Sequence, residues 1–385
     1  MNIINIVLIL LLFTFAFSAL ANINQKFSLF LIEKDYYKTI YAQTGKIYNN
    51  EEIESKLIVD YYFDPSEFFE DDSVNNNNNN NDKIEIEESV ISNALNSIDK
   101  SESRKISYDY NHDNKLSFNF VSVGDFDCKR ETRNTIQNIV NLDPVYVLAL
   151  GDYSYSKSAD CWFKIAEPIR DKLKATMGNH DSESSTKLTD YMNYFGLKKQ
   201  YYSFNYGNIH FLSLSTEVPF HKQSPQYEFV INDLEKTSNN LAIDWIIVFF
   251  HRQMYGSGSN PDAEIDFRDT YHSIFDLYNI DLVLQAHQHI YERIYPIAYN
   301  QQDSDEPLII NQNYDTYIQP QAPIFVTVGT GGASPNNLSY EEDYTVLRMI
   351  DYGVLNIHID NNKMSLEAQF INNNGIIKDS FLIVK

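Results

Sequence analysis

From Ser117 onward the sequence alternates between short apolar runs and segments with helical periodicity, and this alternation restricts the fold more than any other feature. Residues 131–142, 226–236 and 263–278 have the spacing of amphipathic helices. The apolar runs expected as strands are 116–123, 145–150, 173–177, 245–250, 281–285 and 323–329, with a hairpin in 201–215 and three alternating strands in 354–384. Strands that alternate with helices indicate an α/β domain, here with two packed mixed sheets.

Polar side chains directly follow these apolar runs, where α/β sheets gather their binding residues. His287 and His289 are separated by one residue, so their rings point the same way in an extended segment. Each strand end alone is weak evidence, because Gly-Asp is usually a turn and a lone histidine is more often a hydrogen-bonded surface residue. Together they indicate a metal site, since oxygen and imidazole donors without thiolate suit hard or borderline divalent and trivalent ions. The set is Asp125, Asp152 with Tyr155, Asn179 with His180 and Asp181, His251, and His287 with His289.

The first 115 residues differ from the rest of the chain. Residues 1–21 contain an apolar stretch ending in small residues, which predicts a cleaved signal peptide; the alternative is a membrane anchor, for which the stretch is short. Residues 51–88 hold thirteen acidic and two basic residues, and residues 75–81 are all asparagine. We expect 22–115 to be an acidic, Asn-rich region that is flexible in part. Its strand-like start at 26–43 is either a small β unit or a pro-segment, and a catalytic domain spans 116–385.

The formal net charge of −23 limits the partners. Such a chain repels the phosphates of nucleic acid, so we expect no nucleic-acid binding beyond nucleotides as substrates. No later segment is long and apolar enough to cross a bilayer. With the signal peptide, these features predict a protein that is secreted or lies in the lysosomal or endosomal lumen.

The motifs at the strand ends resemble, in their order, those of the calcineurin-like metallophosphoesterases. Gly-Asp at 124–125 is followed by Gly-Asp-x-x-Tyr at 151–155, Gly-Asn-His-Asp at 178–181, His251, and His-x-His at 287–289. The version with tyrosine is that of the purple acid phosphatases, and segments 291–297, 323–334 and 352–384 are similar to that family too. The resemblance covers roughly residues 115–385 and implies a four-layer α/β/β/α sandwich with two mixed sheets.

Seven metal ligands are implied by this resemblance, three for each of two ions and one shared. They are Asp125, Tyr155 and His289 for the first ion, Asn179, His251 and His287 for the second, and Asp152 for both. The family implies Fe³⁺ in the first site and Fe²⁺, Zn²⁺ or Mn²⁺ in the second.

The implied activity is hydrolysis of phosphate monoesters, with a metal-bound hydroxide as nucleophile. His180 is the expected general acid for the leaving group, and Asp181 is expected to orient its ring. The alternatives are a dimetal phosphodiesterase or nucleotide hydrolase, and a non-catalytic secreted binding protein on the same scaffold.

Three features depart from the family pattern. Asp127 stands where purple acid phosphatases have glycine, and Ala286 also replaces a glycine. A pair of adjacent histidines found in larger members is absent, and residues 257–269 occupy that region. We expect Asp127 either to be an extra metal ligand, to accept a hydrogen bond from metal-bound water, or to cap the helix that starts near Glu131.

Two covalent features are expected outside the metal ligands. Cys128 and Cys161 are the only cysteines, and in an oxidising compartment they would form a disulfide; the alternative is two buried thiols. Asn337 begins the sequon Asn-Leu-Ser and is the expected glycosylation site.

Overall fold

The computed structural model describes residues 26–33, 36–49, 52–60, 117–257, 263–338 and 340–385. Contacts divide the chain into two units, residues 1–106 and 107–385. The described part of the first unit is an antiparallel sheet in the order β1-β2-β3, formed by β1 (Lys26–Glu33), β2 (Tyr36–Asn49) and β3 (Glu52–Asp60). The predicted signal peptide and the asparagine run lie outside the described residues.

The second unit contains two seven-stranded sheets. Sheet I has the order β14-β19-β18-β17-β4-β5-β6, and sheet II has the order β16-β11-β15-β10-β9-β8-β7. Sheet I is formed by β4 (Ser117–Val123), β5 (Val147–Ala149), β6 (Leu173–Ala175), β14 (Thr316–Ile318), β17 (Gly353–Asp360), β18 (Ser365–Asn372) and β19 (Ile377–Val384). Sheet II is formed by β7 (Tyr202–Tyr206), β8 (Ile209–Ser213), β9 (Trp245–Arg252), β10 (Leu282–Ala286), β11 (Tyr291–Ile294), β15 (Ile324–Val328) and β16 (Thr345–Met349).

Both sheets are mixed, and their parallel strands carry the predicted site. In sheet I, β4, β5 and β6 run parallel, while β17 pairs antiparallel with β4. In sheet II, β8, β9, β10 and β15 run parallel, while β7 and β11 are antiparallel neighbours. A separate two-stranded sheet joins β12 (Ile297–Ala298) and β13 (Leu308–Ile309). The carboxyl ends of the parallel strands therefore lie at one edge of each sheet.

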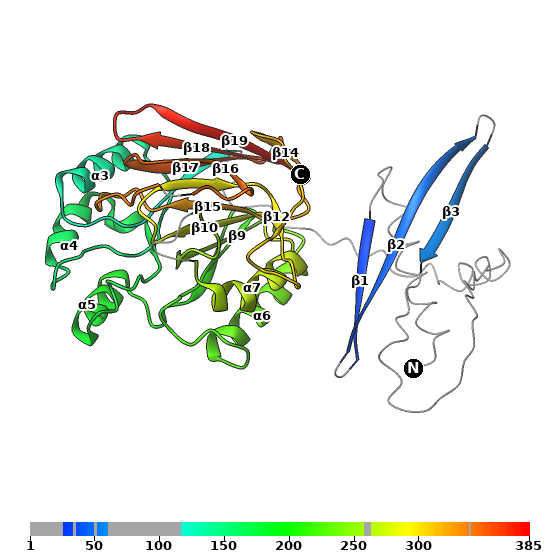
Figure 1. Cartoon of the computed structure of the whole chain (residues 1–385), viewed down its shortest axis with the longest axis horizontal. Coiled ribbons are helices and arrows are strands. Elements are labelled where there is room, and N and C mark those ends of the chain that lie inside the picture. Colours follow the sequence, from blue (N-terminus) through cyan, green and yellow to red (C-terminus); the bar gives the residue numbers. More distant parts are fainter. Residues whose placement is uncertain (1–25, 34–35, 50–51, 61–116, 258–262, 339) are drawn as a thin grey trace, which may run out of the picture. The chain divides into compact units, whose positions relative to one another are not determined.

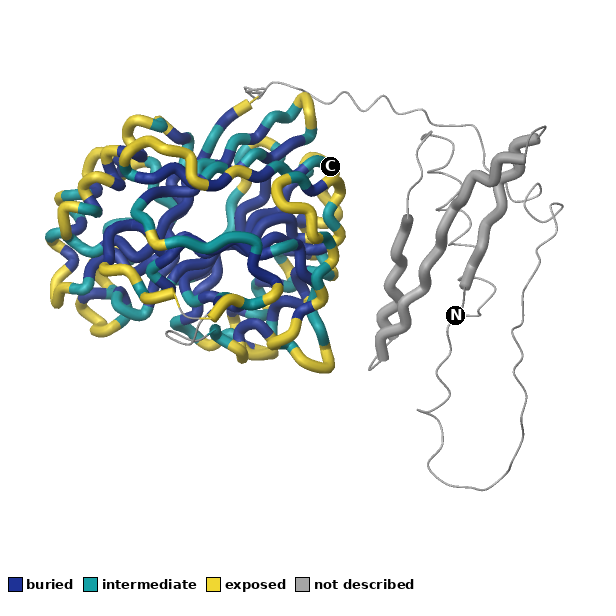
Figure 2. The backbone as a smooth tube through the Cα atoms, turned by 45° about the horizontal axis from the view of Figure 1, so that its top comes forward, coloured by how far each residue is buried: buried dark blue, intermediate teal, exposed yellow. Residues whose placement is uncertain are grey.

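The core lies between the two sheets, which face each other (Figure 1; the buried interior is dark blue in Figure 2). Phe120 of sheet I packs edge-to-face on Phe211 of sheet II, with ring centroids 5.1 Å apart. A buried ion pair also joins the sheets, because Arg293 Nε lies 2.6 Å from Asp379 Oδ2 and Nη2 lies 2.9 Å from Oδ1. Both carboxylate oxygens accept from the guanidinium, so the pair is compensated despite its burial.

Helices complete the outer layers. The main helices are α3 (Arg130–Leu142), α4 (Asp160–Ala166), α5 (Ser185–Phe195), α6 (Pro225–Ser238) and α7 (Ile265–Leu277), and a 3₁₀ helix, η2, spans Glu167–Lys172. Apolar side chains of α6 and α7, such as Leu234 and Phe267, pack with Val248 and Phe250 on the outer face of sheet II. On the side of sheet I, α3 contacts β17 and α5 contacts β6. The predicted four-layer α/β/β/α sandwich is confirmed. Of the helices that the structure describes, none combines the length and apolar character needed to cross a membrane.

Candidate metal centre

The loops after β4, β5 and β10 adopt backbone conformations that side chains other than glycine rarely take. Asp125, Asp152 and His287 have φ values of 58°, 54° and 71°. Such left-handed residues cost free energy and persist where the surrounding structure requires them, often at functional sites. Gly178 is required for a different reason, since a Cβ there would collide with the Asp152 carboxylate. The close approach of these loops brings the predicted ligands together.

The three residues predicted for the first ion lie in mutual contact. Tyr155 Oη is 2.7 Å from His289 Nε2 and 3.1 Å from Asp125 Oδ1. His289 Nε2 is 3.5 Å from the same Asp125 oxygen. An oxygen, a phenol and an imidazole therefore converge from three different loops.

The three residues predicted for the second ion converge in the same way. His251 Nε2 lies 3.1 Å from Asn179 Oδ1 and 3.2 Å from His287 Nδ1. His251 Nδ1 is 2.8 Å from the carbonyl oxygen of Leu150, so it carries the proton and its Nε2 presents a lone pair. The contact therefore leaves Nε2 available as a ligand.

Asp152 lies between the two groups of ligands. Its Oδ2 is 3.3 Å from Tyr155 Oη and 3.4 Å from His251 Nε2, while Oδ1 accepts from the backbone N–H of His180 at 2.9 Å. The ligand atoms of Asp152, His251 and His287 lie within 4.8 Å of one another. One carboxylate thus contacts both groups, as a bridging ligand must.

The donor atoms fit metal ions better than they fit one another. Ligands about 2.1 Å from an octahedral ion are separated by about 3 Å, the spacing seen within both groups. In the second group the facing atoms are an amide oxygen and two imidazole nitrogens, of which His251 Nε2 has no proton of its own in the neutral ring. A cation is the group that satisfies all of them at once.

The metal-free electrostatics also favour a cation. Burial lowers the pKa of His251, but the charge and hydrogen bond of Asp152, the charge of Asp125 and the Leu150 carbonyl oxygen together outweigh burial and raise that pKa to about 10. Burial and the neighbouring His251 lower the pKa of His287 to about 3. Burial, with the charges of Asp125 and Asp152, raises the pKa of Tyr155 well above its usual value. A proton on His251 therefore takes the place of a metal charge, and phenolate formation at Tyr155 needs a nearby cation.

His180 lies beside the ligands, but Asp181 does not orient it. The His180 ring is 4.4 Å from the Tyr155 ring, and its Nδ1 is 2.5 Å from Glu183 Oε1. Asp181 is buried and accepts from the backbone N–H groups of Asp152, Tyr153 and Gly178 at 2.7, 3.0 and 2.9 Å. The expectation for Asp181 was wrong because its neighbours are donors in the turn, and Glu183 is the carboxylate that contacts His180.

A buried lysine supports this contact. Lys187 Nζ donates to the carbonyl oxygen of Ser154 at 2.7 Å and lies 3.5 Å from Glu183 Oε2, with a side chain only 1% exposed. Lys187 is on α5, where the Ser184 side chain caps the helix by accepting from Lys187 N. Neither Glu183 nor Lys187 was identified from the sequence, because α5 was not predicted; the Ser184 cap was the available signal.

Asp127 does not cap α3 and contacts residues of its own loop. Its Oδ1 accepts from its neighbour Cys128 N at 2.7 Å, and its Oδ2 pairs with Lys129 Nζ at 2.8 Å. The N-cap of α3 is Lys129, with no side-chain cap, so the capping expectation was wrong. The carboxylate is held by a cation of its own loop. Ala286, the second departure, has its methyl group against the space that Gly124 leaves free.

His289 is held in place by the loop that follows β15. Its Nδ1 is 2.6 Å from the Ser334 carbonyl oxygen, and its backbone N–H donates to Asn336 Oδ1 at 2.6 Å. Both contacts hold the ring with Nε2 toward Tyr155.

The neighbouring Asn337 is exposed, while Ser339 of its sequon lies outside the described residues. Cys128 and Cys161 form a disulfide, with Cα atoms 6.0 Å apart.

Two family models match the chain. The model described as calcineurin-like phosphoesterase matches residues 112–291, which include all seven predicted ligands. The model described as iron/zinc purple acid phosphatase-like protein C matches residues 322–380. Such a family implies a dimetal centre, in agreement with the two converging groups of donors.

Named relatives are phosphatases, matched over part of their length. Acid phosphatase type 7 of Mus musculus is 28% identical over 274 residues, covering 62% of this chain and 60% of the relative. Purple acid phosphatase 23 of Arabidopsis thaliana is 24% identical over 252 residues, covering 54% and 51%. The chain thus spans about half to three fifths of the curated relatives it matches.

Solved structures show the same fold. A purple acid phosphatase from yellow lupin (Lupinus luteus) seeds has a TM-score of 0.61 at 22% identity, covering 70% of this chain and 54% of that one. A Plasmodium protein described as the anchor in the inner membrane complex has a TM-score of 0.52 at 15% identity, covering 70% and 89%. One fold therefore serves proteins described in very different terms, and activity must be argued from the site. Residues 112–291 thus match the calcineurin-like phosphoesterase family, and residues 322–380 match the C-terminal region of its iron/zinc purple acid phosphatase type.

Proposed function

We propose that this protein is a dimetal phosphomonoester hydrolase of the purple acid phosphatase type. The observation that carries the proposal is the contact of one Asp152 oxygen with both groups of donors, at 3.3 Å from Tyr155 Oη and 3.4 Å from His251 Nε2. A shared carboxylate between two sets of three ligands is the arrangement that holds two ions close together.

The two groups differ in their donors, and this supports an assignment of ions. Asp125, Tyr155 and His289 would hold Fe³⁺, because a phenolate and a carboxylate are hard anionic ligands. Asn179, His251 and His287 carry no negative charge and would hold Fe²⁺, Zn²⁺ or Mn²⁺. When bound, two such ions neutralise phosphoryl oxygens and make an acidic water available as nucleophile.

His180 would donate the proton to the leaving group. Glu183 contacts Nδ1, which directs Nε2 toward a substrate at the centre. The side chain is 34% exposed, so it can reach an ester oxygen from the solvent side. In this role His180 would pass a proton from Nε2 to the departing alcohol. Glu183 would stabilise the protonated ring, and Lys187 would hold Glu183, so both residues would act on His180 rather than on the metals.

The test is metal analysis of the purified protein together with hydrolysis of an aryl phosphate and a bis-aryl phosphate. We expect two metal equivalents with iron, and faster turnover of the monoester. Faster turnover of the diester would indicate a phosphodiesterase. A protein that binds two ions and hydrolyses neither ester would indicate a non-catalytic binding function. Asp125→Asn is the matched control, since it keeps the shape but removes a charged ligand.

We also propose that the chain is secreted or reaches the lysosomal or endosomal lumen. The apolar segment within residues 1–21 and the exposed Asn337 support this address. Expression in eukaryotic cells should give protein that begins after residue 21 and loses mass on treatment with an N-glycosidase. Retention in the cytosol with an intact N-terminus would contradict it.

A further inference from the structure

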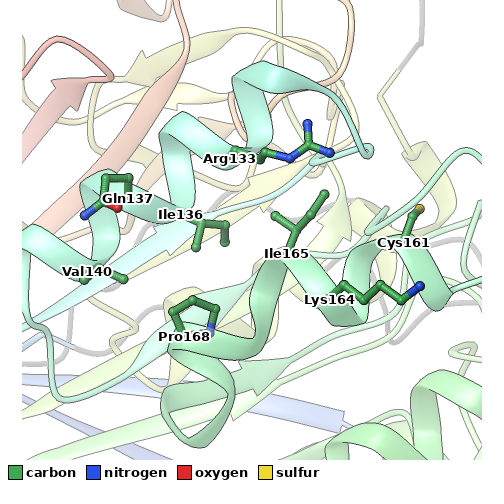
Figure 3. A pocket seen from close by; sticks show the side chains of 8 residues that line it. All are labelled: Arg133, Ile136, Gln137, Val140, Cys161, Lys164, Ile165 and Pro168. Atoms are coloured by element: carbon green, nitrogen blue, oxygen red, sulfur yellow. The ribbon is translucent and has the colours of Figure 1, made fainter.

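A groove between α3 and α4 lies outside the metal centre and opens onto the disulfide. It has a volume of about 560 Å³, within the range of small-molecule sites. Its lining comprises Arg133, Ile136, Gln137, Val140, Cys161, Lys164, Ile165 and Pro168. Figure 3 shows Arg133 and Lys164 toward the end that holds the Cys161 sulfur, and Val140 and Pro168 toward the other end. The groove thus combines an apolar wall with positive charge beside a sulfur atom.

The two cations of the groove differ from their neighbours. Arg133 and Lys164 are exposed, and neither forms an ion pair within the part of the chain that the structure describes. By contrast, Arg170 and Lys172 pair with Glu167 and Asp143. In a chain with a net charge of −23, two uncompensated positive charges beside one sulfur select for an anionic ligand.

The disulfide connects the two loops that carry the oxygen ligands of the first group. Cys128 follows Asp125 by three residues, and Cys161 is the second residue of α4, the helix after the Tyr155 loop. Ser154, directly before Tyr155, places its Oγ 3.5 Å from Cys161 Sγ and 3.7 Å from Cys128 Sγ. Breaking the bond would remove the covalent link between these loops and leave them joined by two backbone hydrogen bonds, from Asp125 N to Gly151 O at 3.0 Å and from Phe126 N to Asp152 O at 2.9 Å.

We propose that this groove binds an anionic low-molecular-weight thiol, which reduces the Cys128–Cys161 disulfide and releases the Asp125 loop. A thiolate attacks Cys161 Sγ, a mixed disulfide forms, and Cys128 leaves as a thiolate that takes up a proton. A second thiolate then attacks the sulfur of the bound thiol, giving an organic disulfide and the Cys161 thiolate, which is also protonated. Two thiols are oxidised by two electrons in all, and the protein disulfide is reduced by the same two.

The reductive step is tested by comparing thiols of opposite charge on the wild-type protein. The probes are reduced glutathione, which is anionic, and cysteamine, which is cationic, at equal thiolate concentration. Reduction is followed by alkylation and mass spectrometry of the peptides that contain Cys128 and Cys161. We expect reduced glutathione to react at least about 10-fold faster, as steering by local charge predicts. Cysteamine reacting as fast as reduced glutathione would overturn the site.

Charge reversal provides the second arm. Arg133→Glu combined with Lys164→Glu should remove or reverse the preference for the anionic thiol. The matched control is Arg130→Glu combined with Arg170→Glu, which changes the net charge by the same amount. Both positions are exposed and lie outside the groove lining, so this variant should keep the preference for the anionic thiol. If both double variants behave alike, the preference comes from net charge and the proposed site is wrong.

The consequence for the metal centre rests on the proposed function and has its own measurement. After reduction and removal of thiol, the holoprotein should lose the metal bound by Asp125 and Tyr155, as should Cys128→Ser, whereas untreated protein keeps it. Reduced protein that keeps all its metal would overturn the release of the Asp125 loop. Protein that never binds metal would contradict the proposed function, while the thiol rates would still decide whether the groove is an exchange site.

Discussion

The two halves of the metal centre supply different atoms and are held by different contacts. The oxygen half consists of Asp125, Asp152, Tyr155 and Asn179, on loops that follow strands of sheet I. The imidazole half consists of His251, near the carboxyl end of β9, and His287 and His289, on the loop after β10 of sheet II. Asp181 fixes the oxygen half from within, by accepting three backbone N–H groups. The imidazole half is fixed from outside, because His251 and His289 contact carbonyl oxygens of residues 150 and 334.

This difference concerns where the orienting contacts come from: the Asp181 turn of the oxygen half is closed locally, whereas the imidazole half takes its orienting contacts from distant segments. The turn around Asp181 closes within residues 152–181 and needs no contribution from sheet II. His251, however, is oriented by a carbonyl oxygen that belongs to the end of β5 in sheet I. The backbone N–H of His287 likewise donates to Asp125 Oδ2 at 2.9 Å. The imidazole half therefore depends on the packing of the two sheets, and each prediction below tests this asymmetry.

The largest effect is expected where the halves meet. Asp152→Asn should abolish binding of both ions, because it removes the carboxylate that the two predicted ions would share. Loss of one electrostatic contact typically lowers turnover by about 10²–10³-fold, so turnover should here fall by more than about 10³-fold. His251→Gln should lose only the second ion. Metal stoichiometry and turnover of both variants, with circular dichroism as a control for folding, provide the check. Equal metal loss in the two variants would contradict the bridging role.

His180→Ala tests a residue that lies beside both halves without being a ligand. Turnover should fall by about 10²–10⁴-fold with the metal content unchanged, as is typical for loss of a general acid. The loss should grow across a series of phosphate esters as the leaving alcohol becomes less acidic. A uniform loss across the series would exclude proton donation by His180.

Asp181→Asn tests the internal support of the oxygen half. The introduced amide would place its N–H₂ against backbone N–H donors, at a cost of about 1–3 kcal/mol in the free energy of unfolding. Metal affinity should fall by about 10–100-fold, as for other residues that orient ligands. Chelator competition and denaturant titration measure the two effects. Glu183→Gln is the control, which should keep metal affinity and stability and lower turnover only.

The imidazole half should make metal binding depend on pH. Burial lowers the pKa of His251, but the charge and hydrogen bond of Asp152, with smaller contributions from Asp125 and the Leu150 carbonyl oxygen, together raise it to about 10 in the metal-free protein. A metal must therefore displace a proton at pH 7, so affinity should rise with pH, by about tenfold per unit below pH 10. Metal affinity measured between pH 6 and 9, with proton release followed in buffers of different ionisation enthalpy, tests this. His251→Gln should remove one released proton.

The smallest effect is expected for Lys187→Met, at the outer edge of the oxygen half. Without Lys187 the Ser154 carbonyl oxygen loses its 2.7 Å donor, and the free energy of unfolding should fall by about 1–2 kcal/mol. Metal content should stay constant, and turnover should fall less than in His180→Ala. Loss of metal in this variant would show that Lys187 acts on the ligands rather than on Glu183.

Much of the fold follows from local pattern, and the exceptions are instructive. The expected strands 116–123 and 245–250 agree with β4 (Ser117–Val123) and β9 (Trp245–Arg252) within two residues. Buried strands are continuous apolar runs, so their pattern is local. The short helix α4 was missed because it depends on packing of residues such as Trp162, and α5 was missed because it begins at the Ser184 cap rather than with a clear apolar periodicity. The strands β11 and β16 were missed because they are defined by pairing with distant segments.

The candidate site divides in the same way. The seven ligand positions were predicted because strand ends and motif order are visible in the sequence, and the structure brings all seven together. The partners of Asp127 and Asp181 were not predictable, because their contacts depend on how each loop turns. The same holds for Ser334 and Asn336, which contact His289 although they lie about 45 positions later in the chain. Sequence pattern thus predicts the candidate ligands, and only the tertiary structure shows which residues orient them.

The position of β4 in sheet I has a consequence for synthesis on the ribosome. β4 lies between β5 and β17, and Asn119 of β4 donates to Asn356 of β17, 237 residues later in the chain. Strand β17 is translated long after β4, and even after β7 to β10 of sheet II. One edge of β4 therefore stays unpaired during most of the synthesis of the chain. Pairing over such distances is slow, and an open edge strand is a site of misassembly. We therefore expect the nascent chain to need protection from aggregation until β17 is made.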